Sequence, residues 1–387
     1  MSEQSAGFTF STTKTIVCEP GCLAQLGTLC ERLAVTNLMV VTDQGIVAAG
    51  LLEKLKTALS QTTLSFVIYD QVVADPPEAI VLAALNQAKR AKIEGVIGFG
   101  GGSSMDVAKL VALLVHSEQS LQEVYGVENA RGNRLPLIQI PTTAGTGSEV
   151  TPIAIITTGE TTKQGVVAPQ LLPDIALLDA DLTLGLPAHV TAATGIDAMV
   201  HAIEAYTSKH RKNPYSDMLA KEALRLLSSH IEVAVKQGSD RQARSKMLLG
   251  AMLAGQAFAN APVAAVHALA YPLGGHFHIS HGLSNSLVLP HVLRFNLAVA
   301  EKEYAELAPA IGVECQGSTA KNAAAFIEKM NEFIAKVGLP QTLSELDIPE
   351  SALTMLAEQG MLQQRLLVNN PRDVTLADAL AIYQAAF

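Results

Sequence analysis

The chain has 387 residues, more than a single hydrophobic core usually holds, so its length predicts two domains. Hydrophobic residues make up 49% of the chain and charged residues only 16%, which is enough apolar material for large buried cores. The net charge of −9 at pH 7 argues against nucleic acid or an anionic membrane as the main partner.

The four cysteines, Cys18, Cys22, Cys30 and Cys315, include no C-x-x-C pair and are too few for a disulfide framework in a chain of this length. We therefore expect reduced thiols. The first residues, MSEQSAGFTF, lack the basic and apolar regions of a signal peptide, and no apolar run approaches the roughly 20 residues that a membrane span needs. These features predict a cytoplasmic protein.

The first half of the chain alternates short apolar runs with helical patterns. The runs 37–43, 64–70, 95–102 and 135–143 end in Gly, Thr or Asp, and the stretches 50–61 and 77–93 between them have helical spacing. This alternation predicts a parallel sheet with helices on its faces, and a ligand beyond the carboxyl ends of its strands. Further strand-like runs follow at 152–158, 163–169 and 174–182.

After Pro187 the pattern becomes helical. The stretches 189–209, 216–238 and 239–260 have apolar residues at helical spacing and few strand signals. We therefore expect an α/β domain over residues 1–187 and an all-helical domain over 188–387. A cleft between two such domains is a common place for a ligand.

Two glycine-bearing loops follow strands of the first half. In the first loop, Gly100, Gly101 and Gly102 precede a helix that Ser103 or Ser104 would cap, and the amides of the first helical turn suit a pyrophosphate. An ordinary tight turn would look the same. The second loop, 141–150, carries hydroxyl side chains and two glycines, and the presence of both loops favours a shared ligand.

Asp43 is the last residue of the predicted strand 37–43. At such a position a carboxylate can accept hydrogen bonds from the 2′-hydroxyl of a dinucleotide ribose and repel a 2′-phosphate. The alternative is a structural role for Asp43 at the start of the helix that follows.

Four residues of the second half have the chemistry of a metal site. Asp197 and His201 are four residues apart on a predicted helix and therefore share one face. His267 and His281 lie in a histidine-rich stretch, and a Pro-Gly-Gly break between them would let the chain turn back. One carboxylate and three imidazoles suit Fe²⁺ or Zn²⁺ better than Mg²⁺ or Ca²⁺.

Five motifs give the chain a resemblance over nearly its whole length to the iron-containing (group III) alcohol dehydrogenases. They are GGGSSMDVAK (100–109), PTTAGTGSEVT (141–151), LLDADLTLGLP (177–187), ATGIDAMVHAIEAY (193–206) and HALAYPLGGHFHISHG (267–282). The resemblance implies a dinucleotide-binding α/β domain followed by a helical metal-binding domain.

The resemblance also implies roles for individual residues. It assigns the metal to Asp197, His201, His267 and His281. It assigns contacts with NAD to Asp43, Asp75, Gly102, Ser103, Asp106, Thr142, Thr143, Thr146, Lys163 and Leu182. Asp43 matches the position associated with a preference for NAD over NADP.

One position departs from many relatives, which carry a second histidine where this chain has Tyr271. A phenol is a poorer base at neutral pH than an imidazole, so the proton route is open among the cofactor ribose, Tyr271, His278 and water. His276 is interpreted as a loop or surface residue.

The sequence therefore predicts a metal-dependent NAD(H) oxidoreductase that interconverts a small alcohol and its aldehyde or ketone, with the substrate oxygen on the metal and hydride passing to or from NAD. Alternatives are a hydroxyacid–oxoacid transhydrogenase of the same family, a dehydroquinate-synthase-like lyase, and a non-catalytic binding protein. We expect a homodimer in which the strand-like segment 8–18 could pair across two copies.

Overall fold

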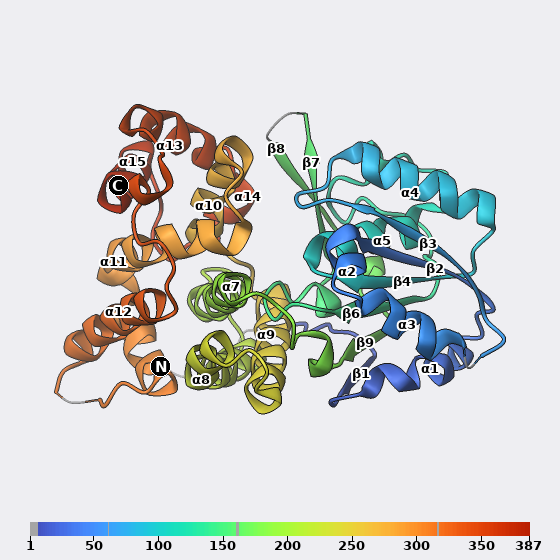
Figure 1. Ribbon diagram of the computed structural model, residues 1–387. Helices are drawn as coiled ribbons and strands as arrows, with labels where there is room; N and C mark the ends of the chain where they lie inside the picture. Colours follow the sequence, from blue (N-terminus) through green and yellow to red (C-terminus); the bar gives the residue numbers. More distant parts are fainter. Residues whose placement is uncertain (1–6, 61, 160–161, 316) are drawn as a thin grey trace.

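The computed structural model describes residues 7–60, 62–159, 162–315 and 317–387. Figure 1 shows two halves side by side, a sheet flanked by helices and a bundle of helices. The expectation of an α/β part followed by a helical part is therefore confirmed.

The α/β half is built on a six-stranded sheet in which every paired strand is parallel. In sheet order the strands are β1 (Thr15–Cys18), β9 (Ile175–Leu178), β6 (Leu137–Pro141), β4 (Gly95–Gly100), β2 (Asn37–Asp43) and β3 (Ser65–Val72). The helices are α1 (Leu26–Arg32), α2 (Gln44–Ala48), α3 (Leu51–Ser60), α4 (Glu78–Ala91), α5 (Gly102–Leu114) and α6 (Leu121–Val124). Short 3-10 helices lie at Cys22–Gln25, Ser148–Val150, Pro169–Leu171 and Ala180–Leu182.

Helices cover both faces of this sheet, and the side chains of the central strands alternate between the two cores that result. In β2, Met39 and Val41 pack in the core formed with α4 and α5, whereas Leu38 and Val40 pack in the core formed with α1 and α3. Successive side chains of a strand point to opposite faces, so an uninterrupted apolar run fits a strand that is buried on both sides.

The strand-like runs at 152–158 and 163–169 form strands, but they do not join the parallel sheet. They are β7 (Ile153–Thr158) and β8 (Thr162–Val167), an antiparallel pair in a separate three-stranded sheet with β5 (Gly126–Val127). This hairpin projects from the α/β half and lies beside α10 (Ala265–Phe277) of the helical half (Figure 1). It therefore borders the space between the two halves.

The helical half begins with α7 (Ala188–Thr207). It continues with α8 (Pro214–Lys236), α9 (Arg241–Asn260), α10 (Ala265–Phe277), α11 (His281–Leu307), α12 (Thr319–Lys336), α13 (Leu353–Met361), α14 (Gln364–Leu367) and α15 (Leu376–Ala386). Further 3-10 helices lie at Ala308–Ile311, Ser344–Leu346 and Glu350–Ala352. Side chains fix several helix starts: Asn213 accepts a hydrogen bond from the N–H of Ser216, and Asp240 accepts one from that of Ala243.

The histidine-rich stretch turns at a different place from the one expected. Helix α10 runs through Pro272, Gly274 and Gly275 to Phe277, and the chain reverses at His278, whose φ of 55° ends the helix in the left-handed region. The Pro-Gly-Gly prediction was wrong because packing outweighs local propensity: the helix is buried as far as Gly274. His276, interpreted as a loop or surface residue, lies in the last turn of α10 rather than in a loop, and it is partly exposed.

All four cysteines are free thiols, as expected, with Cys22 and Cys30 buried. In the described part of the chain, no single helix is long and apolar enough to cross a membrane. Helices α9 and α10 together meet the length and composition of a span, but they are bent by 108°.

Candidate metal centre and cofactor cleft

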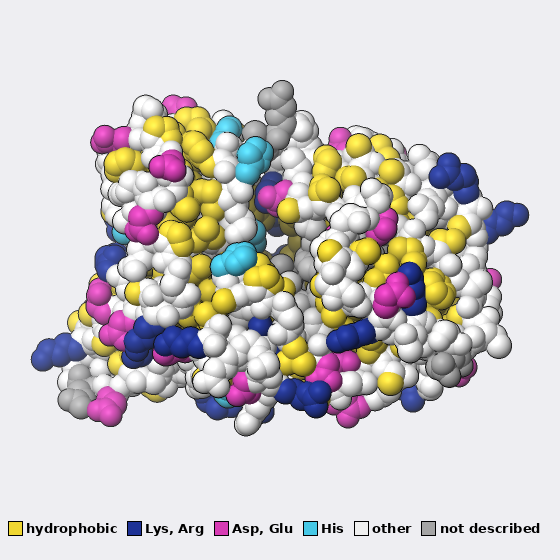
Figure 2. All heavy atoms as spheres, in the orientation of Figure 1, with side chains coloured by type: hydrophobic (Ala, Val, Ile, Leu, Met, Phe, Trp, Pro, Cys, Tyr) yellow, Lys and Arg dark blue, Asp and Glu magenta, His cyan; other side chains and the backbone are white. Residues whose placement is uncertain are grey.

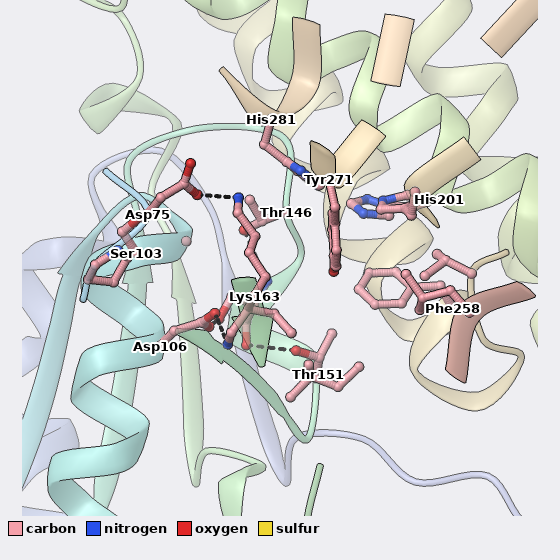
Figure 3. A pocket seen from close by; sticks show the side chains of 18 of the residues that line it. Asp75, Ser103, Asp106, Thr146, Thr151, Lys163, His201, Phe258, Tyr271 and His281 are labelled. Carbon is pink, nitrogen blue, oxygen red and sulfur yellow. Dashed lines mark hydrogen bonds and ion pairs between the residues drawn. The ribbon is translucent and has the colours of Figure 1, made fainter. Parts of the chain in front are cut away.

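A cavity of about 160 Å³ lies between the two halves. Figure 2 shows the molecule hollowed there, with histidine side chains along the border of the helical half. In Figure 3, Asp75, Ser103 and Asp106 enter the cavity from the α/β half, and His201, Phe258, Tyr271 and His281 enter it from the helical half. Both sets of sequence-predicted residues therefore meet around one space.

The four predicted metal ligands converge on this cavity. One donor atom from each of Asp197, His201, His267 and His281 lies within 4.8 Å of the other three. Ligands bound about 2.0–2.2 Å from one ion lie at most about 4.4 Å apart, so small shifts of these side chains bring the set onto a shared divalent cation. Burial lowers the pKa of His201 to about 3 and that of His281 to about 4, so both imidazoles are neutral at pH 7, as metal coordination requires.

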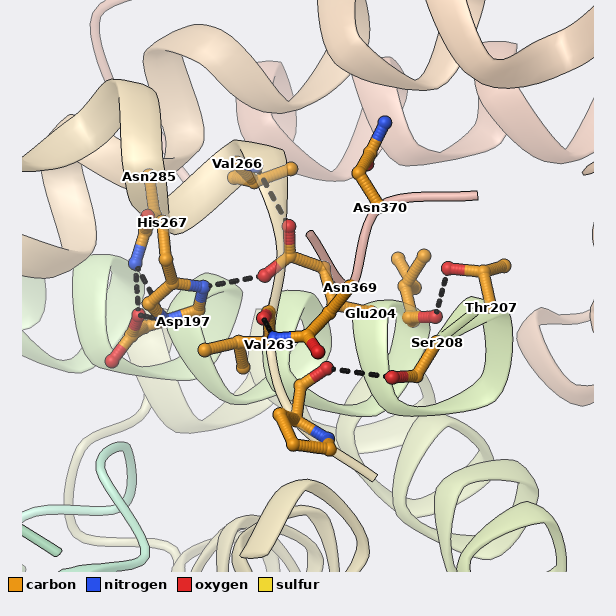
Figure 4. Close-up of polar contacts among 12 residues, drawn as sticks. Asp197, Glu204, Thr207, Ser208, Val263, Val266, His267, Asn285, Asn369 and Asn370 are labelled. Atoms are coloured by element: carbon orange, nitrogen blue, oxygen red, sulfur yellow. Dashed lines mark hydrogen bonds and ion pairs between the residues drawn. The ribbon is translucent and has the colours of Figure 1, made fainter. Parts of the chain in front are cut away.

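Two further polar residues hold this cluster, and sequence reasoning missed both. Glu204 accepts hydrogen bonds from Nδ1 of His267 at 2.6 Å and from the N–H of Val266 at 2.7 Å, which leaves Nε2 of His267 facing the cluster (Figure 4). Asn285 donates its side-chain amide to Asp197 and lies 3.3 Å from Nε2 of both His267 and His281.

Helical spacing could have revealed both residues. Glu204 follows Asp197 and His201 at seven and three positions, so all three lie on one face of α7. Asn285 follows His281 by one turn of α11. An acidic or amide side chain one turn beyond a ligand is a simple signal for a supporting partner.

Replacing Glu204 by Gln is expected to weaken metal binding about 10- to 100-fold. The substitution keeps the size of the side chain but turns one acceptor oxygen into an NH₂ group, which faces either His267 or Val266 as a second donor. Metal affinity measured by competition with a chelator checks the effect. Glu222→Gln, at a surface pair of α8, is the matched control. An unchanged affinity would mean that Glu204 does not orient His267.

The glycine loop forms the cofactor side of the cavity. Helix α5 starts at Gly102 after Gly101, and no side chain caps it, so the predicted N-cap at Ser103 or Ser104 was wrong. Ser104 instead donates its hydroxyl to Asp43 at 3.0 Å. The uncapped first turn leaves backbone N–H groups beside the cavity, which favours an anionic ligand. A Cβ on Gly102 would lie 2.9 Å from Thr146, so only glycine lets the two loops approach this closely.

Asp43 has the structural role that the sequence offered as the alternative, and it also reaches the loop. One carboxylate oxygen caps α2 by accepting the N–H of Ile46 at 3.1 Å, and the other accepts the hydroxyl of Ser104. This oxygen lies 3.1 Å from the Cβ position of Gly100. The carboxylate is therefore fixed beside the glycine turn.

Three other predicted cofactor residues, Thr142, Thr143 and Leu182, do not line the cavity. Thr142 is buried with a hydroxyl that has no hydrogen-bond partner in the described residues, and Thr143 faces Gly101. Leu182 is buried in the core on the α1 and α3 side of the sheet, away from the lining. Of the predicted cofactor residues, the structure places Asp75, Gly102, Ser103, Asp106, Thr146 and Lys163 in the lining.

Asp106 is bound within the protein rather than free in the cavity. Its carboxylate accepts the hydroxyl of Ser148 at 2.7 Å and the N–H of Ile155 at 2.9 Å, and it lies 3.6 Å from Nζ of Lys109. Lys109 ends the GGGSSMDVAK motif, is fully buried, and was not assigned a role from the sequence. This network ties α5 to the second loop and to β7.

Tyr271 and His278, the two candidate catalytic residues, lie in different surroundings. The ring of Tyr271 is in the cavity, 5.9 Å from the His281 ring and 5.5 Å from Nζ of Lys163, which in turn pairs with Asp75. Burial raises the pKa of Tyr271. His278 is exposed and does not line the cavity, because it forms the left-handed end of α10.

Comparison with protein families gives matches over both halves. Residues 13–180 match the model described as "Iron-containing alcohol dehydrogenase", and residues 191–387 match "Fe-containing alcohol dehydrogenase family, C-terminal". The chain is 44% identical over 95% of its length to "Long-chain-alcohol dehydrogenase 1" of Geobacillus thermodenitrificans, of which it covers 93%.

Solved structures show the same architecture. A crystal structure of 1,3-propanediol oxidoreductase matches 99% of this chain and 100% of its own with a TM-score of 0.95 and 33% identity. Sulfoacetaldehyde reductase from Bifidobacterium kashiwanohense in complex with NAD⁺ matches 99% of both chains with a TM-score of 0.89 and 27% identity.

Proposed function

The chain belongs to the iron-containing alcohol dehydrogenase family of metal-dependent, NAD(H)-linked oxidoreductases, and we propose that it uses Fe²⁺ and NAD(H) to interconvert a small alcohol and its aldehyde or ketone. The observation that carries the proposal is the convergence of one carboxylate and three imidazoles on the cavity that the glycine loop also borders. Iron is favoured by the family, and Zn²⁺ fits the same donors.

The metal would be held by Asp197, His201, His267 and His281. When bound, such an ion supplies Lewis acidity toward the oxygen of an alcohol or carbonyl group. The protein's own contribution is to keep the imidazoles neutral by burial and to fix the ring of His267 through Glu204. Phe258 stacks on His201 at 4.3 Å between ring centroids and covers one face of that imidazole.

NAD would lie along the glycine loop and supply or accept the hydride. The amides at the start of α5 suit its pyrophosphate, and Thr142, Thr143 and Thr146 provide hydroxyls on the facing loop. Lys163 is held by Asp75 at the cavity wall, where both can contact the cofactor. The buried position of Leu182 supports an indirect role, as packing beneath the loops.

Tyr271 is the better of the two candidates for handling the proton. Because its raised pKa keeps the phenol protonated at neutral pH, Tyr271 is suited to donate a proton during carbonyl reduction and poorly suited to act as a base. Because His278 is exposed and lies outside the cavity, its role is limited to exchanging protons with solvent.

Replacing Asp43 by Ser is expected to lower the preference for NAD over NADP by about 10- to 100-fold in kcat/KM, because like charges brought together cost several kcal/mol. Serine removes the charge and still caps α2. Steady-state kinetics with both cofactors check the ratio, and Asp43→Asn separates charge from shape. An unchanged ratio in both variants would place the 2′-hydroxyl elsewhere.

We further propose a cytoplasmic homodimer. The support is that β1 is an outer strand of the six-stranded sheet and, within the described residues, pairs with β9 alone, so its other edge can accept a second copy. The segment before it lies against the helical half, where Ser11 exchanges two hydrogen bonds with Asn260. Sedimentation of the full chain tests the assembly.

Two catalytic alternatives make different demands on the cavity. A lyase acting on a phosphate-bearing substrate needs several free cations, but the lining residues of the described chain include only Lys163, which is paired with Asp75, and Arg365. A transhydrogenase would use the same metal and cofactor site as a dehydrogenase, and Tyr271 is the residue that favours this alternative.

The deciding experiment is a panel of alcohols and aldehydes with NAD(H) and NADP(H), on protein stripped by chelator and reloaded anaerobically with Fe²⁺ or Zn²⁺. Steady NADH formation from a simple alcohol supports the dehydrogenase and excludes a transhydrogenase that keeps its cofactor bound. Turnover without any metal would overturn the proposal.

A further inference from the structure

Arg365 lines the same cavity as Tyr271 and the predicted metal ligands, and it has no assigned role. It lies on the short helix α14 next to Leu366, which also lines the cavity. Within residues 7–60, 62–159, 162–315 and 317–387, no ion pair involves Arg365. Among the residues that the structure describes, the guanidinium is therefore a cation at the cavity without an acidic partner.

The guanidinium of Arg365 lies against β8. Its Nη2 lies 3.4 Å from the place where a Cβ of Gly165 would stand. Gly165 and Lys163 are two residues apart on β8 and share a face of the strand. Since Lys163 lies over the Tyr271 ring, Arg365 rests on the face of the hairpin that points into the cavity.

The other charges of the lining are already matched. Lys163 pairs with Asp75, and Asp106 lies beside Lys109 and accepts two hydrogen bonds. The lining also contains apolar residues, among them Ile155, Phe258 and Leu366. Arg365 is itself exposed, and as a cation that lines the cavity it attracts an anion there, with partial screening by solvent.

The two ends of the cavity differ in chemistry. The metal ligands belong to α7, α10 and α11, whereas Arg365 lies over β8, and the Tyr271 ring stands between His281 and Lys163. A ligand that reaches from the histidines to Arg365 therefore carries its reacting oxygen at one end and its anionic group at the other.

We propose that Arg365 binds the terminal carboxylate of an aliphatic substrate whose opposite end is an aldehyde or a primary alcohol, so that the preferred substrates are ω-oxo acids and the matching ω-hydroxy acids. Guanidinium and carboxylate form two parallel hydrogen bonds, which a neutral chain cannot match. The inference rests on the proposed function. In the reducing direction, hydride from NADH forms the C–H bond, a proton goes to the oxygen, and NAD⁺ is released.

The test uses full-length protein reloaded with Fe²⁺ and compares NADH-dependent reduction of 4-oxobutanoate with that of butanal, its neutral analogue. We expect the wild type to prefer 4-oxobutanoate. We expect Arg365→Met to lower kcat/KM for 4-oxobutanoate about 10- to 100-fold, mainly through KM, and to leave butanal within about two-fold. Arg365→Lys should lose part of the preference, because it keeps the charge without the fork of donors.

Arg225→Met, at an exposed surface pair of α8, is the matched control and should change neither substrate. Equal kinetics of the two aldehydes in the wild type, with no change in Arg365→Met, would overturn the role of Arg365 while the dehydrogenase stands. An equal rise in the KM for NADH with both aldehydes would instead assign Arg365 to the cofactor phosphates and also overturn the proposal. If neither aldehyde is reduced, the proposed function itself fails.

Discussion

Replacing His267 by Ala is expected to lower metal-dependent kcat on the order of 1,000-fold, since a Lewis-acid metal contributes several kcal/mol to the barrier and each 1.36 kcal/mol is a factor of ten. His267 is 2% exposed and its ring is held by Glu204, so its replacement by Ala removes one of the four donor atoms of the cluster. The loss should appear together with loss of bound metal after dialysis, measured by mass spectrometry of the metal.

The same variant should still bind NADH, because the cofactor side of the cavity is built from α5 and the loop after β6. Binding measured by NADH fluorescence separates loss of metal from loss of fold. His116→Ala, at an exposed histidine just after α5, is the control and should keep both metal and turnover. Full activity in metal-free His267→Ala would refute the metal-dependent scheme.

The spacing of residues along the sequence was enough to predict half of the metal site. Asp197 and His201 lie four residues apart on a helix, and helical geometry alone places them on one face. The sequence also predicted the parallel sheet, because strands buried on both faces are continuous apolar runs such as 37–43.

Other features depend on contacts between distant segments. The hairpin β7–β8 consists of strand-like runs, but its departure from the parallel sheet is decided by pairing rather than by composition. The continuation of α10 through Pro272 follows from burial, which a local proline signal cannot report.

The resemblance named the residues of the cofactor loop, but it did not show how they are held. Asp43 and Ser104 lie 61 positions apart and meet because β2 and β4 are neighbours in the sheet. Arg365 belongs to none of the five motifs. Its place at the cavity, beside Gly165, is seen only in the folded structure. Long-range positions of this kind have no periodic signal in the sequence.

Replacing Lys109 by Met is expected to destabilise the protein by about 3–5 kcal/mol, the usual effect of removing one partner from a buried charge pair. Nζ of Lys109 donates to Ser148 at 2.8 Å, to Thr151 at 3.2 Å and to the carbonyl of Ile153 at 2.6 Å. Methionine has a similar volume, so the change removes the charge and the three hydrogen bonds without leaving a large cavity. Unfolding in urea, followed by circular dichroism, measures the loss.

The destabilisation should grow as the pH rises. Burial raises the pKa of Asp106 and raises that of Glu149 to about 7, and in both cases Lys109 opposes the rise. A carboxyl group with a raised pKa in the folded state favours folding at low pH, and this contribution is lost as the pH rises through that pKa. Without Lys109 both values move further upward, so more stability is lost at pH 8 than at pH 5.

Two variants test whether charge is the cause. Lys54→Met, at an exposed position of α3, should leave the free energy of unfolding nearly unchanged. Adding Asp106→Asn to Lys109→Met should recover part of the stability, because it removes the uncompensated carboxylate that the first change creates. A pH-independent loss without recovery in the double variant would show that Lys109 acts through packing alone, and it would remove the electrostatic link between the glycine-loop helix and the second loop.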